Sequence, residues 1–179
     1  DPRFVELVLR ESQSVLRYKP GALVVEHRCG FVCANAGIDH SNVNVQDGNP
    51  EDWVLLLPAD PDQSAREIRA RLEQHYGVKI GVSIIDSHGR AWRMGTVGTA
   101  IGISGVPGLV DMRGIKDISG YHLRITEVGI ADELAAAASL VMGQAAERIP
   151  VALVRGFPYQ LRESNAKELL RPRDQDMFR

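Results

Sequence analysis

The 179-residue chain is 44% hydrophobic and 25% charged, a composition typical of a single globular domain. Its net charge of −2 argues against a protein that binds nucleic acid by neutralising phosphates, because that mode normally requires a basic face. No apolar run reaches the roughly 20 residues that span a bilayer, and no leader is recognisable, so we expect no membrane association.

The first half of the chain predicts a helix, a hairpin and a buried strand. Residues 3–17 place apolar side chains near one face, which indicates an amphipathic helix that ends at Pro20. Residues 22–28 and 31–37 are rich in β-forming side chains, so we expect a hairpin between them. The continuous apolar run of residues 53–58 predicts a buried strand.

The second half predicts further alternation of helices and strands. Residues 60–77 indicate the clearest helix, with Asp60 as its cap and Gly77 at its end. Strands are expected at 78–86, 121–128 and 150–156, an Ala-rich helix at 127–143 and a short capped helix at 164–172. Because the two kinds of element interleave, we predict an α/β or α+β fold with mixed sheets and packed helices.

The two cysteines, Cys29 and Cys33, are too few for a disulfide scaffold, and no Cys/His cluster with zinc spacing completes a zinc site. If the strand after Gly30 forms, both thiols share one of its faces and are packed there. A reducing cytoplasm is the location that fits this cysteine content best.

The stretch AGIDHSN, residues 36–42, places Asp39 among polar side chains directly after a predicted strand. One interpretation is a turn, because Asp, Asn, Ser and Gly satisfy local backbone groups. The other is a metal or phosphate site, because Asp86 ends a second predicted strand beside another Ser and His. Two carboxylates at strand ends suit a hard cation such as Mg²⁺ or Mn²⁺. Both interpretations stay open, since the two aspartates are far apart along the chain.

Arg90 and Arg93 follow Asp86, with Trp92 between them. Guanidinium groups bind phosphate oxygens in a planar, bidentate way, so near a metal they would neutralise and position a phosphoryl group. The alternative is a solvated basic loop in which Trp92 is a packed anchor.

The glycine-rich stretch 89–120 is not a nucleotide loop of a common kind. It contains no Gly-Lys-Ser/Thr of a P-loop and no G-x-G-x-x-G of a Rossmann fold, so tight turns and bulges are the better interpretation. A Ser/His nucleophile is not favoured, because no G-x-S-x-G elbow is present. Taken alone, residues 141–149 indicate a C-cap glycine followed by a polar turn that includes Gln144.

Four blocks in a fixed order are distinctive as a set: HRCGFVCANAGIDHSNV, IIDSHGRAWRMGTVGTAIGISG, TEVGIADELAAAASLVMGQ and VALVRGFPYQ…SNAKELLRP…DMFR. Together they resemble the coenzyme F420:L-glutamate ligase family, essentially from end to end of the chain. The resemblance implies a cytoplasmic, homodimeric ligase that adds L-glutamate to the phospholactyl carboxylate of the F420 precursor. It also implies GTP as co-substrate, Mg²⁺ or Mn²⁺, a monovalent cation such as K⁺, and an acyl phosphate intermediate.

The resemblance further assigns roles to particular residues. Asp39 and Asp86 would be the catalytic metal ligands, with Ser87 and Gln144 as additional ligands. GTP would contact Asn42 and the segment after the Ala-rich helix, which comprises Met142, Gly143, Gln144, Ala145, Ala146, Glu147, Arg148 and Ile149. For Arg90 and Arg93, a role in phosphate or substrate binding is a hypothesis from their charge and their place in the second block.

The family's N-terminal segment, which carries further GTP loops, is not matched, so we expect residues 1–179 to be a single ligase domain without it. The sequence leaves open how many glutamates are added, which metal is preferred and whether a C-terminal domain is fused. Two other classes of function also stay open: a non-catalytic binding or assembly module with the ligase fold, and a metal-dependent phosphohydrolase that uses the same aspartates.

Overall fold

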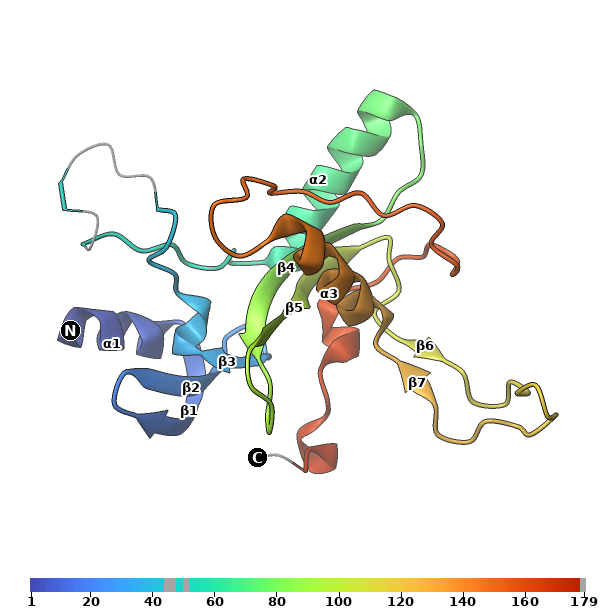
Figure 1. Ribbon diagram of the computed structural model, residues 1–179, viewed down its shortest axis with the longest axis horizontal. Coiled ribbons are helices and arrows are strands. Elements are labelled where there is room, and N and C mark those ends of the chain that lie inside the picture. Colours follow the sequence, from blue (N-terminus) through green and yellow to red (C-terminus); the bar gives the residue numbers. More distant parts are fainter. Residues whose placement is uncertain (44–47, 50–51, 178–179) are drawn as a thin grey trace.

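The computed structural model describes residues 1–43, 48–49 and 52–177 (Figure 1). Its helical elements are α1 (Pro2–Arg10), α2 (Pro61–Tyr76), α3 (Ile130–Met142) and the 3-10 turns η1 (Asn35–Gly37), η3 (Ala166–Leu169) and η4 (Arg173–Gln175). Its strands are β1 (Ser12–Lys19), β2 (Ala22–His27), β3 (Val32–Ala34), β4 (Val82–Gly89), β5 (Thr96–Ser104), β6 (Val110–Asp111) and β7 (Glu127–Val128). Small antiparallel sheets with packed helices define an α+β fold, as expected.

The N-terminal part is a sheet of β1, β2 and β3 with α1 packed beside it (Figure 1). The β2–β3 hairpin confirms the predicted one, and its turn is closed by the Gly30 N–H, which donates to the His27 carbonyl at 2.8 Å. The single helix predicted over 3–17 is wrong in its second half. There the chain becomes β1, because pairing with β2 supplies the backbone with hydrogen bonds that a local apolar pattern does not reveal.

The central part is the β4–β5 hairpin, against which α2 and α3 pack (Figure 1). The helix predicted at 60–77 is confirmed, since Asp60 accepts the Gln63 N–H at 2.8 Å and Gly77 ends it with a left-handed φ of 66°. The strand predicted at 78–86 begins only at Val82 and continues to Gly89, so Asp86 lies within β4 rather than at its end.

Strand β5 corrects the prediction that the glycine-rich stretch consists of turns. Two of its glycines instead allow helices to approach the strand closely. A Cβ on Gly98 would lie 2.3 Å from the Ala135 carbonyl oxygen of α3, and a Cβ on Gly102 would lie 2.3 Å from the Pro61 backbone of α2. The predicted Ala-rich helix is confirmed as α3, and small side chains such as Ala131 are buried in this contact.

Three apolar runs predicted as strands are wholly or mostly irregular. Residues 53–58 make one bridge, between Leu55 and Asp39, and Leu55 is 54% exposed. Residues 150–156 have no strand, and Val151 is 77% exposed. Of residues 121–128, Glu127–Val128 pairs with β6, and His122 makes an isolated bridge with Lys116. The predictions failed because an apolar run forms a strand only where a second strand lies beside it.

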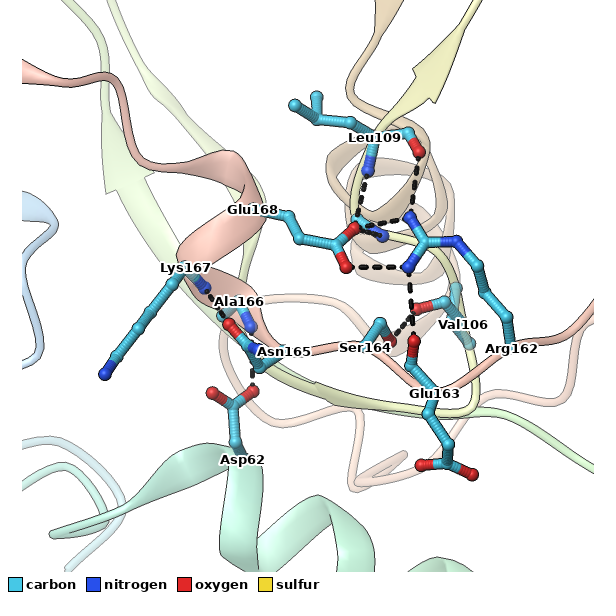
Figure 2. Close-up of polar contacts among 11 residues, drawn as sticks. Asp62, Val106, Leu109, Arg162, Glu163, Ser164, Asn165, Ala166, Lys167 and Glu168 are labelled. Atoms are coloured by element: carbon cyan, nitrogen blue, oxygen red, sulfur yellow. Dashed lines mark hydrogen bonds and ion pairs between the residues drawn. The ribbon is translucent and has the colours of Figure 1, made fainter.

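The C-terminal segment is fastened to the hairpin by the polar network in Figure 2. Glu168 accepts two charged hydrogen bonds from Arg162, at 2.6 and 2.7 Å, and also the Gly108 N–H at 3.0 Å. Asp62 of α2 accepts the Ala166 N–H at 2.9 Å. The helix predicted at 164–172 is therefore the short turn η3, held in place by contacts remote in sequence. Among the described residues, none of the helices combines the length and apolar character that a bilayer crossing requires.

Candidate active site

A cavity of about 630 Å³ gathers three segments that are distant in the sequence. It is lined by the loop after η1, by the middle of β4 and by the turn that follows α3. We call it the acidic cavity, because its charged lining residues are Asp39, Asp86, Glu147 and Arg148. The predicted site residues Asp39, Asn42, Asp86, Ser87 and Met142–Ile149 all line it. Their common location is what a shared site requires, although their individual roles stay predictions.

Asp39 is held by both backbone and side-chain contacts. Its N–H and carbonyl bond to the Leu55 backbone at 3.1 and 2.9 Å. Its carboxylate accepts the Ser41 N–H at 2.7 Å and the Ser41 hydroxyl at 2.9 Å. The turn interpretation and the metal- or phosphate-site interpretation of residues 36–42 are thus compatible, because the Asp39 side chain shapes its own turn and also lines the cavity.

The backbone of the same loop, at Gly37, approaches the Asp86 side chain closely. Asn35, Ala36 and Gly37 are consecutive residues with positive φ, an arrangement that only glycine adopts without strain. A Cβ on Gly37 would lie 2.5 Å from Leu57 Cδ1 and 3.4 Å from Asp86 Oδ2. The loop that carries Asp39 therefore passes directly beside the Asp86 carboxylate, which brings these two distant segments together.

The Asp86 side chain is oriented by a hydrogen bond to a buried histidine. His88 Nε2 lies 3.1 Å from Asp86 Oδ2, and the His88 side chain is 7% exposed. We assign to His88 the tautomer with hydrogen on Nε2, which lets the ring donate to the Asp86 carboxylate oxygen. The ring of Phe31 lies 5.3 Å from that of His88 and stacks on His27 at 4.8 Å, so packed rings fix the histidine.

Burial raises the pKa of the nearby Cys33 thiol. The pKa of Cys33 is raised to about 12, first by burial and then by the charges of Asp86 and Cys29. Cys33 is therefore a packed, protonated side chain at neutral pH, as the sequence predicted for it. Cys29 is half-buried and lies in the β2–β3 turn rather than on a strand beside Cys33.

The turn after α3 folds back on itself at the cavity wall. Gly143 has φ of 75° and ψ of −175°, a backbone conformation that is essentially restricted to glycine. Glu147 accepts the Ala145 N–H at 2.8 Å, and backbone N–H donors hold its pKa below the ordinary value. The Asn42 amide donates to the Ala145 carbonyl at 3.3 Å, which joins this turn to the loop of Asp39.

The donor atoms of the acidic cavity suit a hard cation. Asp39, Asp86, Ser87 and Gln144 offer carboxylate, hydroxyl and amide oxygens, which Mg²⁺ and Mn²⁺ prefer. No group of three or more His, Cys, Asp or Glu side chains among the described residues could hold a metal by itself. Mg²⁺ commonly binds through one or two carboxylates together with phosphate oxygens of a substrate. The set fits a cation that shares its ligands with a nucleotide.

The structure places Arg90 and Arg93 elsewhere. Both lie on the turn between β4 and β5 and line a second cavity, together with Trp92. The structure does not bring them together with Asp39 and Asp86 in the acidic cavity, and their role in phosphate or substrate binding stays a prediction. His88 separates the two cavities along β4, since it lines the second one and bonds to Asp86 in the first.

Sequence reasoning missed four residues that shape the acidic cavity. Gly37 lies beside Asp86, Ser41 holds Asp39, His88 holds Asp86, and Ser139 accepts the Gln144 amide at 3.1 Å. A signal existed for Ser41 and His88, because each stands two residues after its aspartate. None existed for Ser139, which faces the cavity from within the Ala-rich helix.

The fold and the site define an α+β protein whose oxygen-rich cavity is built from strand, loop and helix-end residues. A sequence model of the family F420-0:Gamma-glutamyl ligase matches residues 1–156. The chain is 48% identical over its full length to the coenzyme F420:L-glutamate ligase of Methanococcus maripaludis, of which it covers 69%. It is 48% identical to the enzyme of that name from Methanopyrus kandleri, covering 70% of it, and 42% to that from Methanocaldococcus jannaschii, covering 69%. The chain belongs to the F420-0:gamma-glutamyl ligase family.

Proposed function

We propose that this chain is a ligase that joins the amino group of L-glutamate to the phospholactyl carboxylate of the F420 precursor, with GTP and a divalent cation. One observation carries the proposal: a single cavity collects Asp39, Asn42, Asp86, Ser87 and the 142–149 turn. The names of the relatives, at up to 48% identity over the whole chain, support the substrates. GTP as the nucleotide is what the resemblance to the ligase family implies, and the cation is our inference from the oxygen-rich lining of the acidic cavity.

The proposed reaction has two steps. A carboxylate oxygen of the precursor attacks the γ-phosphorus of GTP. A phosphorus–oxygen bond forms, which gives an acyl phosphate, and the bond from the γ-phosphorus to the bridging oxygen breaks, which releases GDP. The glutamate amine then attacks the acyl carbon, an amide bond forms, phosphate leaves and the amine gives up its proton. A divalent cation held by Asp39, Asp86, Ser87 and Gln144 would supply charge neutralisation to the phosphates.

The residues of the chain would bind and orient the reactants. Asn42 and the backbone N–H groups of the 142–149 turn are suited to hold the nucleotide, and Gly143 keeps that turn tight. His88 would hold the Asp86 carboxylate in one orientation, so that the carboxylate is already oriented to bind the cation. K⁺ as an additional cation, a homodimer and a cytoplasmic location complete the proposal. The homodimer is suggested by apolar side chains of α3 that face outward, including Leu140, which is 87% exposed.

The test is a product assay with the purified chain, precursor, L-glutamate, GTP and Mn²⁺ or Mg²⁺. We expect equal amounts of the glutamylated product, GDP and phosphate, and a lower rate with ATP. Phosphate release without amide formation would instead indicate a phosphohydrolase. Absence of nucleotide binding in calorimetry, in a chain that is folded, would indicate a non-catalytic module.

A further inference from the structure

The second cavity, of about 1340 Å³, has the opposite charge balance to the acidic cavity. Among the described residues, four aspartates and seven cationic side chains line it. We call it the basic cavity, after Arg17, Arg28, Arg66, Arg90, Arg93, Lys167 and Arg171. Because the whole chain has a net charge of −2, this is a local concentration of positive charge.

Several of these cations are not neutralised within the domain. In the described part of the chain, Arg17, Arg90, Arg93 and Lys167 form no ion pair, whereas Arg28 lies 3.1 Å from the Glu11 carboxylate. In Figure 2 the Lys167 side chain extends away from the network that holds its backbone N–H. Free cations that line a cavity attract an anionic ligand.

Two of the four aspartates that line the basic cavity accept hydrogen bonds from backbone N–H groups. The Asp62 carboxylate accepts the backbone N–H groups of Ile103 and Ala166, at 2.8 and 2.9 Å. The Asp132 carboxylate accepts the Ala100 N–H at 2.9 Å, and burial raises its pKa. These carboxylates are oriented toward backbone donors, and the seven cationic side chains outnumber the four aspartates, so a ligand in the cavity meets an excess of positive charge.

An exposed aromatic ring stands between the two arginines of the turn. The Trp92 side chain is 90% exposed, and its φ is 63°. Positive φ is an outlier for a bulky residue, and strained residues of this kind cluster at ligand sites. An indole beside two guanidinium groups offers a stacking surface next to a phosphate-binding fork.

The two cavities adjoin along elements that contribute to both. On β4, residues 85–87 line the acidic cavity and 88–89 the basic one. On β5, Gly98 lines the first and Thr99 the second, and these elements lie against α3 in Figure 1. An elongated ligand in the basic cavity could therefore place one end beside Asp86.

We propose that the basic cavity binds the carboxylate co-substrate of the ligase, an anion that combines a flat conjugated ring with a phosphate. Arg90 and Arg93 bind the phosphate of its tail, Trp92 stacks on the ring, and the terminal carboxylate passes His88 into the acidic cavity. This inference rests on the proposed function, because it concerns how the acceptor of that reaction is held.

The phosphate could also belong to GTP, so the test measures the two ligands separately by calorimetry. The precursor is titrated without nucleotide or metal, GTP is titrated with Mn²⁺, and inorganic phosphate serves as a third titrant. The variant Arg90→Gln/Arg93→Gln should weaken precursor binding about tenfold or more, since it removes two charge-assisted phosphate contacts. Its affinity for GTP with Mn²⁺ should stay within about twofold of the wild type.

Arg124→Gln is the matched control, because Arg124 is an exposed arginine over Tyr121 that lines neither cavity. It should leave both affinities unchanged. Trp92→Leu should weaken the precursor but not inorganic phosphate, which separates ring stacking from charge. An unchanged precursor affinity in the double variant, or a loss confined to GTP, would overturn the inference.

Turnover distinguishes this failure from failure of the proposed function. If the precursor binds through Arg90 and Arg93 but no glutamylated product forms, only the proposed reaction is wrong. If product forms and the KM for the precursor is the same in the double variant and the wild type, only the basic-cavity assignment is wrong. In the result we expect, that KM rises about tenfold while the KM for GTP is unchanged.

Discussion

The acidic and the basic cavity differ in charge, and in the function we propose each would bind a phosphate-bearing molecule in its own way. In the first, Asp39 and Asp86 would repel a triphosphate unless a cation lay between them, so binding there should depend on metal. In the second, Arg90 and Arg93 would contact an anion directly, so binding should be independent of metal. The comparison suggests that one β-hairpin keeps two anionic reactants apart until their reacting ends meet near His88.

The largest expected effect is the loss of metal-dependent turnover in Asp86→Asn. Removing one carboxylate from the cation's ligands should lower kcat by on the order of 100-fold or more and weaken Mn²⁺ binding. The fold should persist, because Asp86 is partly exposed at the cavity wall. Precursor binding without metal should be unaffected, and a parallel loss there would break the comparison between the two cavities. Asp174→Asn, on an exposed aspartate outside both cavities, is the control.

His88 tests whether the acidic cavity depends on a residue that faces the basic one. His88→Leu should weaken Mn²⁺ binding about tenfold, because the carboxylate it orients becomes free to rotate. His88→Gln keeps an N–H donor and should restore most of the affinity. Electron paramagnetic resonance of free Mn²⁺ measures this without turnover. Equal affinities in wild type and His88→Leu would show that Asp86 does not need the hydrogen bond.

Glu168 tests how the wall of the basic cavity is held. Arg162 lowers the pKa of Glu168 below its ordinary value of 4.5, so its stabilising effect is complete above that pH and is lost as pH falls through the lowered value. Glu168→Gln should cost about 2 kcal/mol of unfolding free energy at pH 7 and progressively less in acid. Denaturant titration across pH measures this. A cost that stays constant with pH would contradict the assignment, and Glu6→Gln, in an exposed pair with Arg10, is the control.

Gly37 gives the smallest and most local expected effect. Gly37→Ala adds a Cβ at positive φ beside Leu57 and Asp86, whereas Gly21→Ala adds one at positive φ with nothing within 4 Å. Both variants carry the backbone strain, so their difference isolates crowding of the acidic cavity, about 1 kcal/mol of stability. Mn²⁺ affinity should fall in Gly37→Ala only. A loss in both variants would assign the effect to the backbone.

Local sequence rules predicted the elements whose signals are local. Asp60 and Gly77 mark the two ends of α2, and the Ala-rich composition predicted α3. The same rules failed where partners distant in sequence decide the structure. The residues of β1 have a helical apolar pattern, but they form a strand because β2 lies beside them. Gly98 indicated a turn, yet it lies in β5, where the absence of a side chain allows α3 to pack closely against the strand.

The acidic cavity could be predicted residue by residue only through resemblance to a family. Charge and spacing alone did not show that Asp39 and Asp86 belong to one cavity, because their proximity depends on how the loop after β3 passes β4. The same limit applies to Arg90 and Arg93. They are close to Asp86 in sequence, but the β4–β5 turn carries them into the other cavity.

The most direct test of the account is a double-mutant cycle of Mn²⁺ affinity over Asp39→Asn and Asp86→Asn, measured in the presence of GTP. If both carboxylates bind one cation, the double variant should lose little more affinity than either single variant, since the first substitution already dismantles the site. Losses that add fully in the double variant, or a full affinity in either single variant, would contradict a shared cation in the acidic cavity.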